Sequence, residues 1–189
     1  MRKLIIVSGA SGAGKSFFLE TARQIDGIIP IAKLSTREPR SYEGLDSKRF
    51  IDVFGGRSYE EVRQCDYVYL YADNYYGFNR REINDIFAQS KNPIVIVNNY
   101  ETLVHLLTEY HDVLSIYIMS TLSGKDLAGI LKKQGRTEIE IEKRMETAQQ
   151  DIKNFAEHIS ENLFTYVLIN AYDTSLEIQM RDIFSRHLY

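Results

Sequence analysis

A glycine-rich segment directly after a short apolar run constrains this chain more than any other feature. Residues 3–7 read KLIIV, and residues 7–18 read VSGASGAGKSFF. The apolar run is continuous, rich in β-branched residues and ended by glycine, which is typical of a buried parallel strand. The residues that follow, 16–24, predict a helix. The sequence therefore predicts a strand, a glycine-rich turn and a helix in immediate succession.

The turn matches the pattern G-x-x-x-x-G-K-[ST], which is typical of phosphate-binding loops in this strand-to-helix context. Glycines allow main-chain N–H groups to converge on phosphate oxygens, and the start of the helix adds partial positive charge. Lys15 is expected to reach the β- and γ-phosphates, and the Ser16 hydroxyl to ligate Mg²⁺. The alternative is a glycine-rich turn that carries an exposed lysine. The residues predicted to bind ATP are Gly9, Ala10, Ser11, Gly12, Ala13, Gly14, Lys15, Ser16 and Phe17.

Composition narrows the class of protein further. A chain of 189 residues fits one domain, and an apolar content of 44% is in the globular range. The net charge of −3 comes without a long block of one sign, which argues against binding to nucleic-acid polymers or membranes. No apolar run approaches the length of a membrane span, and the one cysteine, Cys65, excludes an internal disulfide. We expect a cytoplasmic monomer or homodimer, with Cys65 as a small buried residue.

Strands alternate with helices along the rest of the chain. Apolar runs at 92–99 (NPIVIVNN), 113–119 (VLSIYIM) and 165–170 (TYVLIN) predict buried strands, and the loose alternation within 66–78 also suggests strands. Helices are expected at 59–64, 81–90, 102–110, from 123 onward, and at 175–184. This order predicts an α/β fold, a P-loop NTPase-like three-layer sandwich with a mostly parallel central sheet. One buried helix face is predicted from three- and four-residue spacing at Ile141, Met145, Ala148, Ile152, Phe155 and Ile159.

The phosphate-loop pattern is shared by kinases, GTPases and motor ATPases, so other segments must separate them. No N-K-x-D segment of the kind that reads guanine in GTPases is present. The strand PIVIV ends in Asn98 and Asn99, where a motor ATPase usually carries an acid, and Asp73 is a weak substitute. A kinase is the class that remains.

Four segments resemble the guanylate kinase family, in the order in which that family has them. They are SGASGAGKS (8–16), LSTREPRSYEG (34–44), DNYYGFNRREI (73–83), and the pair EIEKRMETAQQDI (140–152) with YVLIN (166–170). STREPR followed by NYYG is more specific than the loop, and the resemblance covers nearly the whole chain. It implies a single domain over 1–189, with a core of about 1–32, 91–125 and 163–189. An acceptor-binding subdomain would span about 33–90, and a lid with its following helix about 126–162.

The resemblance also implies roles for individual residues. Arg37, Arg40 and Tyr76 would hold the phosphate of the acceptor, and guanidinium forks suit a phosphate dianion. Arg144 matches the catalytic arginine of the lid, and Asn170 the residue that touches adenine. Arg136 lies near another lid arginine, although QGR replaces G-R-G there. An earlier lid arginine falls on Ile130, with Lys132 and Lys133 as candidates to replace it. The predicted catalytic residues are Lys15, Arg37, Arg40, Arg136 and Arg144.

Several of the residues that recognise guanine in the family are replaced by other residue types in this chain. Tyr69 falls nearest to the expected glutamate, Phe78 replaces a serine or threonine, and Ile96 and Asn98 replace acids. Arg49 stands near an expected tyrosine, and both Arg49 and Asn98 are predicted to contact the acceptor.

Three functions stay open. The first is transfer from ATP, with Mg²⁺, to GMP or dGMP, which gives ADP and GDP or dGDP. The second is a kinase of another phosphorylated acceptor, such as ribose 1,5-bisphosphate or a different nucleoside monophosphate. The third is a non-catalytic guanylate-kinase-like binding module.

Overall fold

The computed structural model describes residues 2–39, 52–133 and 137–188, with Lys133 described by its backbone alone. The strands are β1 (Leu4–Gly9), β2 (Ile28–Pro30), β3 (Lys33–Ser35), β4 (Val53–Phe54), β5 (Tyr67–Tyr71), β6 (Asn74–Phe78), β7 (Asn92–Ile96), β8 (Val113–Ser120) and β9 (Tyr166–Asn170). The helices are α1 (Lys15–Ala22), α2 (Tyr59–Val62), α3 (Arg80–Ala88), α4 (Tyr100–Glu109), α5 (Gly124–Lys133), α6 (Glu138–Glu157) and α7 (Ser175–His187), with a 3₁₀ turn η1 at Ile159–Glu161.

A five-stranded sheet runs in the order β2-β7-β1-β8-β9. β2 pairs with β7 in parallel, with Ile28 opposite Asn92, and β8 pairs with β9 in parallel, with Ile116 opposite Tyr166. β1 and β7 are buried along their whole lengths, which explains why their sequences are continuously apolar. The predicted α/β fold with a mostly parallel central sheet is confirmed.

The chain forms two compact units. The first consists of Met1–Ile6 and Leu19–Val113, and the second of Val7–Phe18 and Leu114–Tyr189. The first unit contains a four-stranded sheet in the order β4-β3-β6-β5. β6 pairs antiparallel with both β3 and β5, and β4 pairs in parallel with β3. The second unit contains the glycine-rich loop together with α5, α6 and α7.

The stretch 66–78, in which strands were predicted, forms β5 and β6, and β5 follows the alternation of a half-buried sheet. Tyr67 and Tyr69 are buried, whereas Leu70 is exposed. Opposite them on β6, Phe78 pairs with Tyr67 and Tyr76 pairs with Tyr69. This face of the small sheet is therefore lined with aromatic rings.

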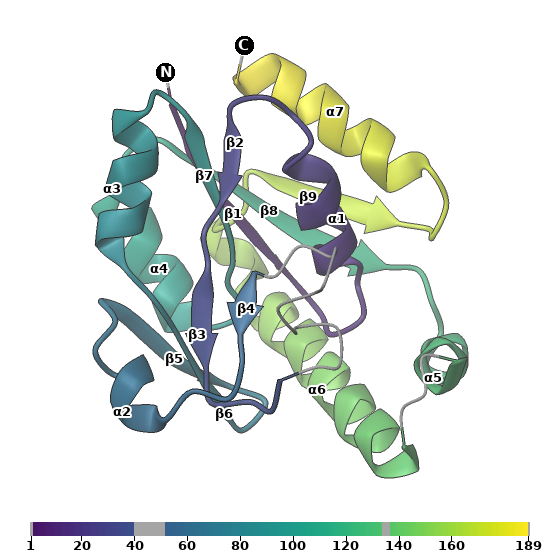
Figure 1. The fold of residues 1–189 in the computed structure, drawn as a ribbon. Coiled ribbons are helices and arrows are strands. Elements are labelled where there is room, and N and C mark those ends of the chain that lie inside the picture. Colours follow the sequence, from purple (N-terminus) through teal and green to yellow (C-terminus); the bar gives the residue numbers. More distant parts are fainter. Residues whose placement is uncertain (1, 40–51, 134–136, 189) are drawn as a thin grey trace. The chain divides into compact units, whose positions relative to one another are not determined.

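The helical region after residue 123 is two helices, which lie beside each other in Figure 1. The second, α6, starts at a capping box in which Thr137 and Glu140 satisfy each other's main-chain N–H groups. The prediction of one continuous buried face was wrong at two residues. Ile152 is 54% exposed, and Ile159 is 62% exposed because α6 has already given way to η1.

Cys65 is only partly buried, which corrects the prediction of a fully buried residue. Its side chain lies against Gly77, where a Cβ would come within 2.9 Å of the sulfur. Burial is the main reason that the pKa of the Cys65 thiol lies above its ordinary value. In the part of the chain that the structure describes, no helix is long and apolar enough to cross a bilayer.

Candidate active site

The glycine-rich loop joins β1 to α1 within the second unit, with Lys15 as the first residue of the helix. Gly9, Gly12 and Gly14 have φ angles of +148°, +82° and +98°, a region that L side chains rarely adopt. A Cβ on Gly9 would also strike the carbonyl oxygen of Ile118 on β8. The spacing of the glycines in the sequence therefore reflects both backbone conformation and close packing.

The side chain of Lys15 folds back over the loop. Its Nζ atom donates hydrogen bonds to the carbonyl oxygens of Gly9, at 2.5 Å, and Ala10, at 2.7 Å. The ammonium group thus lies at the loop, where the pattern predicts it. Ser16 and Phe17 follow in the first turn of α1, and both are exposed.

The glycine-rich loop receives hydrogen bonds from two side chains, those of Asn170 at the end of β9 and of Tyr172 just after it. The Asn170 side chain, which is 4% exposed, donates to the Ala13 carbonyl at 2.9 Å and accepts from Tyr172 N at 2.8 Å. The Tyr172 hydroxyl in turn donates to the Gly12 carbonyl. Asn170 therefore supports the loop, and its predicted contact with adenine stays a prediction. Tyr172 was missed, since no pattern in the sequence marks this residue.

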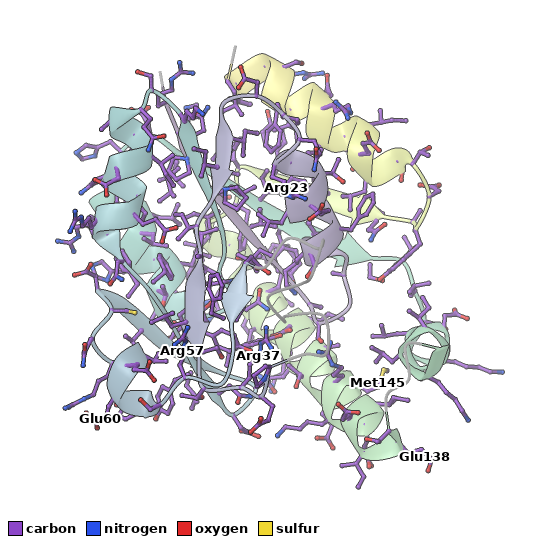
Figure 2. All side chains as sticks on the ribbon, in the orientation of Figure 1. Arg23, Arg37, Arg57, Glu60, Glu138 and Met145 are labelled. Carbon is purple, nitrogen blue, oxygen red and sulfur yellow. The ribbon has the colours of Figure 1, made fainter. Side chains whose placement is uncertain are left out.

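The helix α6, in the segment predicted to form the lid, carries Arg144 about two turns after its start, and the arginine is half-buried. The neighbouring Met145 points toward α5, where its methyl carbon is 3.0 Å from the position that a Cβ on Gly124 would take (Figure 2). One turn further on, Ala148 is buried in one apolar cluster with Ala10 of the loop. Three of the predicted arginines, Arg40, Arg49 and Arg136, lie outside the described residues.

Arg37 belongs to the first unit and binds main-chain groups around β4 (Figure 2). Its guanidinium donates to the carbonyl oxygens of Glu38, at 3.0 Å, and Val53, at 3.2 Å. Its own carbonyl accepts from Gly56 N at 2.7 Å. Arg37 thus bonds to Glu38 beside it and to residues at and after β4, and its role toward an acceptor stays a prediction.

Tyr76 stacks on Tyr69, with ring centroids 5.6 Å apart and an angle of 14° between the planes. The Tyr69 hydroxyl makes a long hydrogen bond, 3.4 Å, to the Ile96 carbonyl. Burial raises the pKa of the Tyr69 phenol, so the ring remains neutral. Near the end of β7, the Asn98 Oδ1 atom is buried and has no hydrogen-bond partner among the described residues.

A buried cation that the sequence did not predict lies in the small sheet, on β3. Lys33 is 3% exposed, and its Nζ donates to the Ile96 carbonyl at 2.9 Å. The same atom lies 3.8 Å from the Asp52 carboxylate. A lysine is rarely buried unless it is paired. In the sequence, Lys33 lies next to a leucine within the run IIPIAKLST, and this pattern does not predict a buried, paired lysine.

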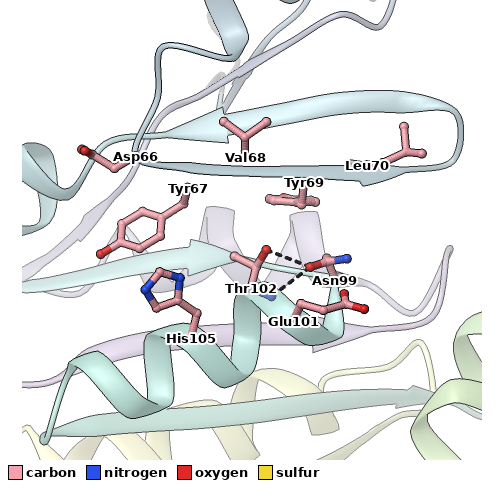
Figure 3. A pocket seen from close by; sticks show the side chains of 9 residues that line it. All are labelled: Asp66, Tyr67, Val68, Tyr69, Leu70, Asn99, Glu101, Thr102 and His105. Carbon is pink, nitrogen blue, oxygen red and sulfur yellow. Dashed lines mark hydrogen bonds between the residues drawn. The ribbon is translucent and has the colours of Figure 1, made fainter.

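One pocket of about 390 Å³ lies between β5 and α4 in the first unit (Figure 3). Its residues are Asp66, Tyr67, Val68, Tyr69, Leu70, Asn99, Glu101, Thr102 and His105. Asn99 caps α4 by accepting from Thr102 N at 2.9 Å and from the Thr102 hydroxyl at 2.8 Å. The lining carries two carboxylates, and it includes the strand in which a guanine-reading glutamate was expected.

Comparison with known proteins gives a consistent result. The family model described as guanylate kinase matches residues 1–179. A guanylate kinase of Hydrogenovibrio crunogenus is 27% identical over 185 residues, which cover 96% of this chain and 86% of that protein. One of Porphyromonas gingivalis is 31% identical over 170 residues, covering 80% and 83%.

A solved structure supports the same fold. The crystal structure of guanylate kinase from Anaplasma phagocytophilum matches with a TM-score of 0.66 at 16% sequence identity. The match covers 100% of this chain and 87% of that one. The family match extends over nearly the whole chain and includes the loop, STREPR, NYYG and the helix that carries Arg144. The chain belongs to the guanylate kinase family.

Proposed function

We propose that this protein transfers the γ-phosphoryl group of ATP to GMP or dGMP, giving ADP and GDP or dGDP. The observation that carries the proposal is the loop, in which three left-handed glycines and the Lys15 ammonium form a phosphate cradle. The named relatives are guanylate kinases, and the loop is the part that any member needs to hold ATP.

Positioning and charge neutralisation supply the catalysis in this proposal. The attacking oxygen of a nucleoside monophosphate is already anionic, so the reaction needs no strong general base. Lys15 and Arg144 neutralise charge on the transferred group. Arginines of this kind raise kcat by a factor on the order of 10³–10⁵. Arg37 and Arg40 hold the acceptor, with Tyr76 as a hydroxyl donor, and Arg136 joins the lid arginines.

Mg²⁺ would bind at Ser16. Its hydroxyl is exposed at the start of α1, directly after Lys15. Mg²⁺ usually keeps several waters and takes its remaining oxygens from few side chains and from substrate phosphates. The described residues contain no group of three or more His, Cys, Asp or Glu side chains arranged for a metal, so a site of one hydroxyl plus phosphates fits the donors present. Held at Ser16, the ion would supply positive charge that offsets the negative charge developing on the transferred group.

In this proposal the lid with its following helix spans about 126–162, as expected from the sequence. The acceptor-binding part spans about 33–90. Closure of the lid would exclude water and so limit hydrolysis of ATP. The proposed assembly is a cytoplasmic monomer or homodimer.

A second candidate acceptor is favoured by one observation on β5. Tyr69 is buried and stacked on Tyr76, in the strand where a glutamate was expected to pair with guanine. A site without its hydrogen-bonding partners loses much of its discrimination between acceptors. The second candidate is therefore a phosphorylated acceptor other than GMP, such as ribose 1,5-bisphosphate or another nucleoside monophosphate.

An acceptor panel separates these functions. The purified protein is supplied with ATP, Mg²⁺ and one acceptor at a time: GMP, dGMP, AMP, CMP, UMP or ribose 1,5-bisphosphate. We expect the fastest ADP release with GMP or dGMP, with the matching diphosphate as product. The highest kcat/KM with ribose 1,5-bisphosphate would support the second candidate. ATP binding without turnover of any acceptor would support the non-catalytic binding module.

A further inference from the structure

A side chain of α6 binds the phosphate loop directly. The Asp151 Oδ2 atom accepts a hydrogen bond from the main-chain N–H of Ser11 at 3.0 Å. The two residues are 140 positions apart in the chain. A charged acceptor makes this one of the stronger kinds of hydrogen bond, so it ties the helix to one point on the loop.

Apolar contacts on the same side of α6 fix its distance from the loop. Ala10 of the loop packs in one cluster with Leu127 and Leu131 of α5 and Ala148 of α6. Met145 is partly buried against that cluster. Ala10 and Ala148 are small, which allows the backbones of loop and helix to approach closely.

The register of α6 links these contacts to the predicted catalytic arginine. Arg144, Ala148 and Asp151 are separated by four and three residues, so they lie on one face of the helix. Asp151 lies seven positions after Arg144, which corresponds to about 10 Å along the axis. With Asp151 bonded to Ser11 and Ala148 packed in the cluster that contains Ala10, the helix has little freedom to rotate or slide at Arg144.

We propose that Asp151 is a positioning residue, which fixes α6 on the phosphate loop so that Arg144 is aimed at the phosphoryl group in transfer. This inference rests on the proposed function. Asp151 acts through Arg144 and is not itself a catalytic residue. Its carboxylate orients the helix by accepting from Ser11, and loss of its negative charge would weaken that bond and let Arg144 move away from its working position.

A buried tyrosine beside Asp151 offers a matched control. Tyr117 on β8 is 5% exposed and stacks on Phe155 of α6, with ring centroids 3.9 Å apart. Burial first, and then the negative charge of Asp151, raise the pKa of this phenol. Its hydroxyl has no hydrogen-bond partner in the described ranges, so it does not hold Asp151 in place. Tyr117→Phe thus changes the surroundings of Asp151 but leaves the contact with Ser11.

The test is a double-mutant cycle between Asp151→Asn and Arg144→Ala, measured with ATP and the acceptor that the panel selects. We expect Asp151→Asn to lower kcat about tenfold, while the Kd for ATP changes less than about threefold. The double variant should be no slower than Arg144→Ala alone, since Asp151 acts through that arginine. Asp151→Glu should recover most of kcat, and Tyr117→Phe should match the parent protein.

A second readout does not depend on turnover. Hydrogen exchange of the Ser11 amide should become faster in Asp151→Asn and stay slow in Tyr117→Phe. If the asparagine variant does not fold, Asp151→Ala serves in the same cycle, with thermal unfolding as the check on folding. The inference would be overturned if the losses in kcat of the two single variants multiplied in the double variant. It would also be overturned if Asp151→Asn lowered the affinity for ATP as much as it lowered kcat. An inactive parent protein would instead count against the proposed function.

Discussion

The phosphate loop and the small sheet of the first unit differ in what holds their functional groups. In the loop, main-chain atoms hold them: left-handed glycines shape the turn, and the carbonyls of Gly9 and Ala10 receive the Lys15 ammonium. In the small sheet, large side chains dominate, through stacked tyrosines and the buried ammonium of Lys33. A site formed by main-chain atoms requires glycine at fixed positions in the sequence, because the turn needs backbone angles that other residues rarely adopt. A site made of side chains admits many combinations.

The largest effect that tests this comparison is expected at the loop. Lys15→Ala should lower kcat about a thousandfold, because it removes a full charge aimed at the transferred phosphates. Steady-state turnover with the acceptor chosen from the panel measures it. Lys91→Ala, in the loop before β7, is the control and should behave as the parent. Full turnover in a folded Lys15→Ala protein would refute the assigned role.

On the acceptor side, Arg37→Ala should raise the KM for the acceptor about a hundredfold and the KM for ATP less than about threefold. In the proposed function, the interaction lost is a charge-assisted bond from Arg37 to the acceptor phosphate. Initial rates with one substrate varied at a time separate the two constants. Arg81, which is exposed on α3 and 3.5 Å from Asp85, provides a control arginine. Equal rises in both KM values would contradict an acceptor-specific role.

Backbone strain in the loop has a smaller effect, on stability. Gly9→Ala should lower the free energy of unfolding by about 3 kcal/mol, since the new Cβ meets the Ile118 carbonyl at a φ of +148°. Gly27 is the matched control, with a φ of +83° and no atom within 4 Å of the position that a Cβ would take. Gly27→Ala should cost only about 1 kcal/mol. Chemical denaturation compares the two, and equal losses would show that packing against β8 is unimportant.

The smallest of these effects concerns the buried cation. Lys33→Met should lower the free energy of unfolding by about 2 kcal/mol, because Asp52 loses its ion pair and the Ile96 carbonyl loses the shorter of its two side-chain hydrogen bonds. Asp52 keeps some contact with water, which limits the loss. Lys153→Met, on the exposed part of α6, should change stability by less than about 0.5 kcal/mol. A neutral Lys33→Met would show that the small sheet does not depend on this ion pair.

The difference between a site held by main-chain atoms and one held by side chains also explains how much could be predicted from the sequence. The fold class and the loop followed from hydrophobic period and glycine spacing, since both patterns arise from local backbone geometry. Tyr172, Lys33 and Asp151 were not recognised, because each acts on a residue far away in the chain. The exposed Ile152 was misassigned for a related reason: periodicity marks an apolar stripe but not where its packing partner ends.

The bond between Lys15 and the loop's own carbonyls bears on how tightly a nucleotide can bind. The Lys15 ammonium already has internal acceptors in the loop, the carbonyl oxygens of Gly9 and Ala10. An arriving phosphate group must therefore exchange partners with the protein, and only the difference between old and new bonds contributes to affinity. Such an exchange lowers the net affinity and so eases release of the product, which suits the proposed kinase, from which ADP would have to leave in every cycle.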